Sequence, residues 1–580
     1  ACERPFDAEN CCKNIVKFKP AHSNAWHVLG TVYQYQGNLN KAINCYSKAT
    51  HIQPDLSESY YFSANAQREL GDLNKAVSLY EKAIKYKESY LEALANLGAT
   101  LLELNRYDES LSVLIDAFKL KPDAVQILCS LAAVMLAFRR PDDALLYILK
   151  AEKIDSSFYD VQRLLGSIYK ELGRYDKSIE SYQILLSINV NDELAIAAMA
   201  SIFERQGRYM DAFDLIKSPL DLNTVNKSIL VTFSKLYGKI DRDNNSIQLI
   251  EAVLQNENTL SDEVIDLHYE LGRRYDKNAE YDLAFKHYKL ANDKTRAQYS
   301  DVTEKNRMKN HTSMLPKWLP DDQSGFFDQI SSSSNVSQQP VFVVGMLRSG
   351  TTLTEQILSS HPDIQAGSEL IGLQFINPVL KYDAQSEPDY YQTHKNIDTG
   401  VLNTIADSYL NKVNTLADKT PRIIDGIRTQ LDYFTIIARV FPNAHVIYTS
   451  REPLDNCLSI YFQNLGATPT LAYTSDLQEI GKSYIHQMNL MAYYKKVLDI
   501  NILEIKYEDL ATNLEETSKK MIEFCGLDWD ERCLNFHKTK RDVITPSYDQ
   551  VRQPIYTKSI QRWKHYNEHL NELKNVLSEV

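Results

Sequence analysis

The sequence lacks the cysteine and histidine spacings that mark metal sites and disulfide frameworks. Its 580 residues include 8 Cys and 13 His, but they contain no C-x-x-C pair and no H-E-x-x-H motif. Because zinc sites and disulfide-rich scaffolds depend on such spacings, we expect neither a metal nor a disulfide framework. A reducing compartment is then the default expectation.

Long apolar runs and an excess of positive charge are also missing. No stretch approaches the roughly 18 apolar residues of a membrane-spanning helix, and the start ACERPFDAEN lacks the apolar core of a signal peptide. We therefore expect a cytoplasmic protein without a transmembrane segment. The formal net charge of −12 argues against nucleic acid as a partner, because phosphate contacts need a basic surface. A local basic site for a small anion remains compatible with it.

The first half of the chain contains an internal repeat. Residues 24–55, NAWHVLGTVYQYQGNLNKAINCYSKATHIQPD, share a skeleton with five later segments at a spacing of 34 residues. This period, with the Leu-Gly, Tyr, Ala and Pro positions of the first copy, is that of the tetratricopeptide repeat (TPR). Each copy has a small residue in its first helix and Ala or Ser at a fixed point of its second helix. These two sets are Gly30, Ala64, Gly98, Ala132, Gly166 and Ala200, and Ala42, Ala76, Ser110, Ala144, Ser178 and Ala212.

The repeats predict an all-α TPR solenoid over residues 1–300. Small residues let the two helices of a repeat approach closely, and no single pair can bury its apolar face alone, so the stack is the folding unit. Residues 267–291 are one further copy and residues 222–260 are degenerate, which gives about eight repeats. The usual use of such a solenoid is to bind a polypeptide substrate or partner protein.

Composition and period change in the second half. The segment DDQSGFFDQISSSSNVSQQP ends in a polar, Ser-rich stretch, so we predict a linker over residues 301–339, with a surface loop inside one domain as the alternative. After it, the apolar runs VFVVGM, AHVIYTS and NILEIKY alternate with helical segments. This alternation predicts a P-loop-like α/β domain over residues 340–580, with a central parallel sheet. The chain is thus a multidomain protein of α and α/β type.

A loop with the spacing of a nucleotide-binding motif follows the first of these strands. GMLRSGTT, residues 345–352, matches G-x-x-x-x-G-K-[ST] except that a threonine replaces the lysine. Backbone N–H groups at a helix start, hydroxyl groups and a guanidinium would together hold an anion there. The missing lysine and the lack of an Asp suited to magnesium argue against ATP hydrolysis, with a P-loop kinase as the alternative. The candidate residues are Arg348, Ser349, Gly350, Thr351 and Thr352.

A second basic and hydroxyl-bearing pair follows another strand. Arg451 stands at the end of the strand, and Ser459 comes about two helical turns later in YTSREPLDNCLSIYF. An ion pair between Arg451 and Glu452 is the structural alternative. Taken with the first loop, the pair indicates a nucleotide that carries phosphates at two separate places.

These segments resemble sulfotransferases that use 3′-phosphoadenosine 5′-phosphosulfate (PAPS). VVGMLRSGTTLTEQILSSHPDI resembles their 5′-phosphosulfate loop, and PNAHVIYTSREPLDNCLS resembles their 3′-phosphate motif. EIKYEDL, DKTP and YDQVRQPIYTKSIQRWKHY are similar to segments of TPR-containing and protein-tyrosine sulfotransferases. The resemblance covers residues 340–580 with the motifs in the same order. It implies a PAPS-dependent sulfotransferase that needs no metal.

The resemblance also implies which residues hold the cofactor. Residues 348–352 would surround the 5′-phosphosulfate, and Arg451 and Ser459 would hold the 3′-phosphate. Tyr507 of KYEDL would line the nucleotide site. Arg562 of QRW would be a basic residue on the cofactor, although the alignment is looser there.

Three further residues match catalytic positions of the protein-tyrosine branch. Glu369 would be the base that takes the proton of an attacking hydroxyl. Lys419 and Ser547 would stabilise the negative charge that grows on the bridging oxygen. The alternatives are a surface or capping carboxylate for Glu369 and an exposed ion pair with Asp418 for Lys419.

The sequence departs from the family pattern at three places. Leu347 stands where the family has Pro, Ser368 precedes Glu369 where the protein-tyrosine branch has an acid, and Gln463 replaces a basic residue. These changes keep sulfuryl transfer as the prediction and weaken the assignment of the acceptor. We expect a protein tyrosine as the acceptor, with a glycan or a small hydroxylated metabolite as the alternative. A non-catalytic TPR adaptor is the alternative of another class.

Overall fold

The computed structural model describes most of the chain, in two compact units, residues 1–202 and 203–580. The described residues are 5–138, 140–221, 229, 231–233, 236, 245–255, 262–298, 331–367, 397–416, 420–427, 434–465, 471–539 and 550–578. Within these ranges, none of the helices combines the length and apolar character that a bilayer crossing requires.

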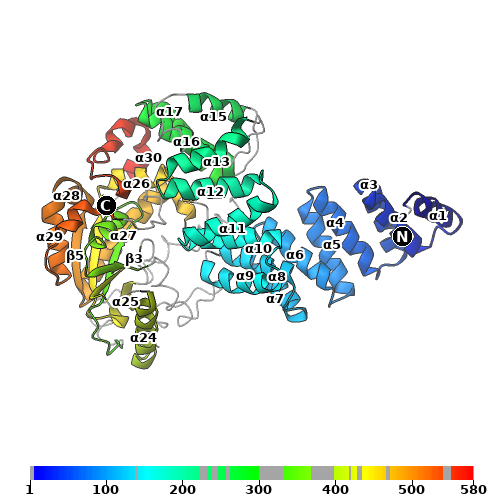
Figure 1. Cartoon of the computed structure of the whole chain (residues 1–580), viewed down its shortest axis with the longest axis horizontal. Helices are drawn as coiled ribbons and strands as arrows, with labels where there is room; N and C mark the ends of the chain where they lie inside the picture. The colour runs from blue at the N-terminus through cyan, green and yellow to red at the C-terminus, as the bar shows by residue number, and fades with distance from the viewer. Residues whose placement is uncertain are drawn as a thin grey trace. The chain divides into compact units, whose positions relative to one another are not determined.

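The first unit consists of helix pairs joined by short turns, as the TPR pattern predicts (Figure 1). The two helices of each pair pack along one another, and each pair packs on the next. The predicted solenoid is therefore confirmed. Its helices in this unit are α1 (Pro5–Phe18), α2 (Ser23–Tyr35), α3 (Leu39–Ile52), α4 (Ser57–Glu69), α5 (Leu73–Tyr86), α6 (Leu91–Glu103), α7 (Tyr107–Leu120), α8 (Val125–Ala137), α9 (Pro141–Ile154), α10 (Tyr159–Glu171) and α11 (Tyr175–Ile188). The division between the two units falls within α12 (Glu193–Arg205), and α13 (Tyr209–Asp221) belongs to the second unit.

The repeated small residues lie where the two helices of a pair touch. A Cβ added to Gly30 would lie 2.6 Å from Cε1 of Tyr46, so only glycine leaves room for this ring. Ala42 on the second helix is fully buried. In the third repeat its place is taken by Ser110, whose hydroxyl donates to the carbonyl of Gly98 at 2.7 Å. A serine is tolerated at this buried position because its hydroxyl is hydrogen-bonded.

Another helix pair of this kind belongs to the second unit. Here α16 (Asp262–Lys277) packs on α17 (Tyr281–Gln298), preceded by α15 (Asn245–Gln255). A Cβ on Gly272 would lie 2.7 Å from Cε1 of Tyr288, which repeats the contact of the first repeat. The compact units thus divide inside the repeat array and not at the predicted linker. Of that linker only residues 331–339 are described, and Ser333 N–H donates to the Arg439 carbonyl at 2.8 Å.

A parallel five-stranded sheet forms the centre of the second unit, as predicted. Its order is β2-β3-β1-β4-β5, so β1 lies between β3 and β4. Every residue of β1 and β4 is buried, in keeping with their unbroken apolar sequences. The strands are β1 (Pro340–Gly345), β2 (Ile364–Ala366), β3 (Arg422–Ile427), β4 (His445–Ser450) and β5 (Asn501–Lys506).

Helices cover both faces of this sheet. On one face Phe342 and Val344 share a core with α24 and α25, and on the other Val341 and Val343 share one with α20 and α29. Alternate residues of one strand thus serve two cores. The helices and 3₁₀ turns of this part are α20 (Thr351–Leu358), α24 (Thr399–Leu416), α25 (Phe434–Val440), α26 (Pro453–Tyr461), η3 (Ala472–Ser475), α27 (Leu477–Val497), α28 (Tyr507–Thr512), α29 (Leu514–Phe524), η4 (Glu531–Lys538), η5 (Gln550–Arg552), η6 (Arg562–His569) and α30 (Asn571–Leu577).

Candidate anion-binding site

The predicted phosphate loop connects β1 to α20 at the point where the strand order reverses. From β1 the chain runs to β2 on one side of it, and after β3 it crosses to β4 on the other side. In open parallel sheets, ligands bind beyond the carboxyl ends of the strands at such a switch point. The loop therefore stands where a ligand site is expected.

Close packing against β4 fixes the first half of this loop. A Cβ on Gly345 would lie 2.3 Å from Oγ1 of Thr449 and 2.6 Å from its carbonyl oxygen, so only glycine leaves room here for β4. The hydroxyl groups of Ser349 and Thr449 lie 2.8 Å apart, and Ser349 N–H donates to the Met346 carbonyl at 3.1 Å. Ser349 thus fixes the loop to the sheet, and its direct contact with an anion stays a prediction.

Left-handed backbone shapes the second half of the loop. Arg348 has φ 65° and Gly350 has φ 110°, which turns the chain into α20. The N-cap residue of α20 is Gly350, which has no side chain to cap the helix. The first N–H groups of a helix have no partner within it, and together with the helix dipole they favour an anion. Thr351 and Thr352 stand buried in this first turn, as the motif requires.

Leu347, which stands where the family has proline, is fixed by a hydrogen bond to its backbone carbonyl. Its carbonyl accepts a hydrogen bond of 2.7 Å from Nδ2 of Asn456, a fully buried residue of α26. The side chain of Leu347 packs at the edge of an apolar cluster that includes Met346. An amide from a neighbouring helix thus constrains the loop where the family uses the rigidity of proline.

Arg451 lies at the end of β4 beside this loop. Its guanidinium stacks 4.5 Å over the Tyr507 ring, and its NH1 and NH2 groups donate to the carbonyls of Arg348 and Ser559 at 3.2 and 2.7 Å. Its Nε is buried without a hydrogen-bond partner in the described part of the chain. Glu452 turns away and caps α26, accepting from Asp455 N–H at 2.7 Å. The ion pair that was the structural alternative for Arg451 is therefore not formed.

Arg348 and Ser459, assigned from the sequence to different phosphates, contact each other. Nε of Arg348 donates to Oγ of Ser459 at 3.2 Å, and its NH2 group donates to Oε1 of Gln550 at 3.0 Å. Burial, reinforced by the nearby charge of Arg451, lowers the pKa of Arg348 to about 10. Two guanidinium groups held so close favour an anion between or beside them.

Sequence reasoning missed the residues that complete this arrangement. The hydroxyl groups of Ser559 and Tyr507 lie 2.6 Å apart, and the carbonyl of Ser559 holds Arg451. Asp455 accepts from the backbone N–H groups of Gln561 and Trp563 at 2.5 and 2.9 Å. The signal for these residues was that YTKSIQRW and, for Asp455, REPLDNCLS fall in segments similar to the family, since long-range contacts leave no local pattern.

Arg562 forms an ion pair in this structure. Its NH2 group lies 2.7 Å from Oδ2 of Asp276, and its guanidinium stacks 5.3 Å over the Phe462 ring. Its charge still contributes to lowering the pKa of Arg348, so it belongs to the same positive cluster. Direct contact of Arg562 with a cofactor stays a prediction. The other three predicted residues, Glu369, Lys419 and Ser547, lie outside the described residues.

Comparison with known proteins assigns both parts of the chain. Residues 340–531 match the model of a sulfotransferase family. The sheet unit carries a sulfotransferase domain. Residues 21–89, 67–132 and 163–191 match tetratricopeptide repeat models. The loop at 345–352, Arg451, Ser459 and Tyr507 lie within the matched residues, which follow the TPRs. Within the described residues, no group of three His, Cys, Asp or Glu is arranged to hold a metal ion near this domain or elsewhere.

Similar proteins cover only part of this architecture. An uncharacterized protein of Aquifex aeolicus (strain VF5) is 31% identical over 342 residues, 58% of this chain and 44% of that protein. A protein-tyrosine sulfotransferase of Drosophila melanogaster is 23% identical over 274 residues, 45% of this chain and 53% of that protein. The chain thus spans about half the length of these two relatives. A solved tetratricopeptide repeat protein of Parabacteroides merdae is 16% identical, covering 43% of this chain and 97% of its own, with a TM-score of 0.38.

Proposed function

We propose that this protein is a PAPS-dependent sulfotransferase that acts on a polypeptide. The observation that carries the proposal is the arrangement at the end of β1 and β4. There an uncapped helix start in a lysine-free phosphate loop lies beside the buried Arg451, which forms no ion pair within the described residues. Such a site suits an anionic nucleotide bound without a metal.

The residues present fit this cofactor. The N–H groups and hydroxyls at Thr351 and Thr352 would hold its 5′ end, and Arg451 and Ser459 its 3′-phosphate. The Tyr507 ring orients the Arg451 guanidinium by stacking, which limits the freedom that binding would otherwise remove. When bound, PAPS supplies an activated sulfuryl group. The buried, unpartnered Nε of Arg451 gives the site a donor that an anion would satisfy.

The chemistry of transfer requires a base and a charge-stabilising pair, for which we propose three residues. Glu369 would accept the proton from the acceptor hydroxyl. Lys419 and Ser547 would donate hydrogen bonds to the oxygen on which negative charge grows. The resemblance of their motifs to the protein-tyrosine branch supports these roles.

For the acceptor we propose a protein tyrosine, and for the TPRs the binding of the substrate or of a partner protein. The support is the combination of a TPR array, whose usual ligands are polypeptides, with a domain similar to a protein-tyrosine sulfotransferase. A cytoplasmic location stays a prediction, which cell fractionation with an antibody would test.

A labelled-donor experiment tests the proposal. With radiolabelled PAPS, the full chain should transfer label to a tyrosine-containing peptide, and parallel glycan and phenol acceptors test the alternatives. Glu369→Ala should bind the donor and lose transfer, whereas Arg451→Ala should weaken donor binding. Arg532→Ala is the matched control, since Arg532 is exposed and, among the described residues, forms an ion pair with the nearby Asp530. Donor binding without transfer to any acceptor would support a TPR adaptor, and absence of donor binding would refute the proposal.

A further inference from the structure

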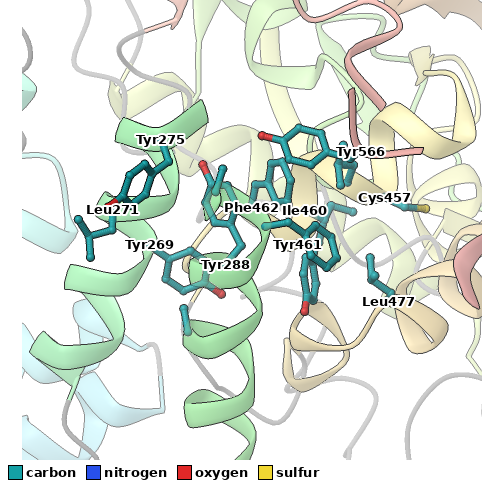
Figure 2. Close-up of a cluster of buried hydrophobic side chains, with 14 of the residues drawn as sticks. Tyr269, Leu271, Tyr275, Tyr288, Cys457, Ile460, Tyr461, Phe462, Leu477 and Tyr566 are labelled. Carbon is teal, nitrogen blue, oxygen red and sulfur yellow. The ribbon is translucent and has the colours of Figure 1, made fainter. Parts of the chain in front are cut away.

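The last described helix pair of the repeat array packs directly on the sulfotransferase domain. Figure 2 shows the Tyr288 ring of α17 beside the Phe462 ring at the end of α26, with the Tyr566 ring of η6 next to Phe462. The Tyr288 and Phe462 rings stack with centroids 3.9 Å apart, and Asn292 donates to the Tyr461 carbonyl at 3.0 Å. Phe462 directly follows the helix that carries Ser459. This interface therefore begins within one turn of a predicted phosphate contact.

One carboxylate of this interface, that of Asp276, contacts two residues of the C-terminal segment. Asp276, in the last turn of α16, accepts a hydrogen bond from the Tyr566 hydroxyl through Oδ1 and pairs with Arg562 through Oδ2 at 2.7 Å. A negative charge at a helix C-terminus opposes the helix dipole, at a cost of a few tenths of a kcal/mol to about 1 kcal/mol. The stability of α16 by itself therefore does not explain Asp276. The two contacts of Asp276 with Arg562 and Tyr566 explain it.

The residues just before Arg562 reach the candidate anion site. Ser559 accepts a hydrogen bond from Arg451 through its carbonyl and contacts Tyr507 through its hydroxyl. Between Ser559 and Arg562 the chain turns through Gln561, which has φ 59°, a strained value for a residue with a side chain. The segment 559–562 is therefore a short, bent link between Asp276 and Arg451.

We propose that Asp276 is a positioning residue for the donor-nucleotide site, an inference that rests on the proposed function. It holds the Arg562 guanidinium in one orientation and fixes segment 559–562, which in turn orients Arg451 and Tyr507. The helix pair α16–α17 is then a working part of the sulfotransferase. The catalytic unit of this protein begins inside the repeat array, before residue 340.

The same interface supplies a matched control. Asp282 of α17 pairs with His569 at 2.8 Å, but this pair is exposed and does not involve segment 559–562. Asp282→Asn removes one carboxylate between the same helix pair and η6 and leaves the link to Arg451 intact. A difference between Asp276→Asn and Asp282→Asn therefore reports positioning, because the loss of a charge at the interface is common to both.

The experiment measures binding of adenosine 3′,5′-bisphosphate by titration calorimetry and the donor dependence of transfer, in the full chain. We expect Asp276→Asn to weaken binding about tenfold, or about 1.4 kcal/mol, and to raise KM for the donor while kcat changes little. Asp282→Asn should match wild type, and Asp276→Glu should recover most of the affinity. Combining Asp276→Asn with Arg562→Gln should add no loss beyond the larger single effect.

Two results would overturn the inference. The first is that Asp276→Asn binds the nucleotide as tightly as Asp282→Asn or more tightly. The second is that the losses of affinity caused by Asp276→Asn and Arg562→Gln add fully in the double variant, which would mean that Arg562 acts without Asp276. Should Asp276→Asn fail to fold, Tyr566→Phe keeps the carboxylate, removes one of its two partners and should weaken binding about threefold; unchanged binding would again overturn the inference. A wild-type chain that does not bind the nucleotide would remove the proposed function itself, whereas wild-type binding with an unaffected Asp276→Asn removes only the role of Asp276.

Discussion

Gly350 is the position at which a single added methyl group tests the candidate site most directly. Its φ of 110° lies outside the range that residues with side chains readily adopt, and a Cβ there would lie 3.0 Å from Cδ2 of Tyr507. Gly350→Ala therefore combines a backbone strain with a contact tighter than van der Waals distance. The ring that must give way is the one that stacks on Arg451.

The size of the two effects can be separated. Adopting positive φ costs an alanine about 1–2 kcal/mol relative to glycine. Moving the Tyr507 ring disturbs its stacking on Arg451, an interaction worth about 0.5–2 kcal/mol, so donor binding should weaken between roughly twofold and thirtyfold. The backbone strain should lower the stability of the sheet unit, and the ring movement should lower the affinity.

Gly71→Ala is the control for the strain alone. Gly71 has φ 82° between α4 and α5, and a Cβ there would meet nothing within 4 Å. Scanning calorimetry should show a similar loss of stability for both variants, each in its own unit. Titration with adenosine 3′,5′-bisphosphate should show weaker binding only for Gly350→Ala. Unchanged affinity of Gly350→Ala would contradict the placement of the nucleotide beside Tyr507 and Arg451.

Three further predictions follow from the same contacts. Burial and the charge of Arg451 lower the pKa of Arg348 to about 10. In the free protein the charged guanidinium is therefore destabilised, and it loses its proton as the pH rises through that value. Binding of an anion needs the charge, so affinity for adenosine 3′,5′-bisphosphate should fall as the pH rises through about 10, and titration of Arg348→Gln at the same pH values should give a flatter profile. Magnesium-dependent ATP turnover should be absent from the wild type by a phosphate-release assay; turnover lost in Thr351→Ala would support a P-loop kinase instead. Tyr182→Ala should destabilise the first unit by about 3–5 kcal/mol, because this nearly fully buried ring fills the space beside Gly166, and a calorimetric transition that does not move would refute the packing account.

The repeat array could be predicted from the sequence because its physics is local. A small residue must face a large side chain 16 residues later, as Gly30 faces Tyr46, Gly98 faces Leu114 and Gly272 faces Tyr288, and this contact imposes a constant spacing. The parallel sheet was predictable for a similar reason, since strands buried on both faces read as unbroken apolar runs. Both the repeat and the buried strands can therefore be recognised from residues that lie close together in one segment.

The candidate site was predictable in part. Arg348, Arg451, Ser459 and Tyr507 were found because each follows a strand end in a recognisable motif, and the structure brings all four together. Ser559 and Asp455 were missed because their contacts join segments more than 50 residues apart. The catalytic assignments of Glu369, Lys419 and Ser547 remain predictions from motif resemblance.

The sequence by itself determined the TPR solenoid and the α/β domain after it, and it predicted an anion-binding loop at 345–352, because periodicity, strand composition and helix starts are local properties of a chain. The tertiary structure decided which groups hold the buried charges. It placed Asp276 of a repeat helix against Arg562, and it left Arg451 paired with carbonyl groups and an aromatic ring in place of Glu452. The physical reason is that the partner of a buried charge depends on which elements the fold brings together in space. That partner cannot be predicted from the order of residues within one segment.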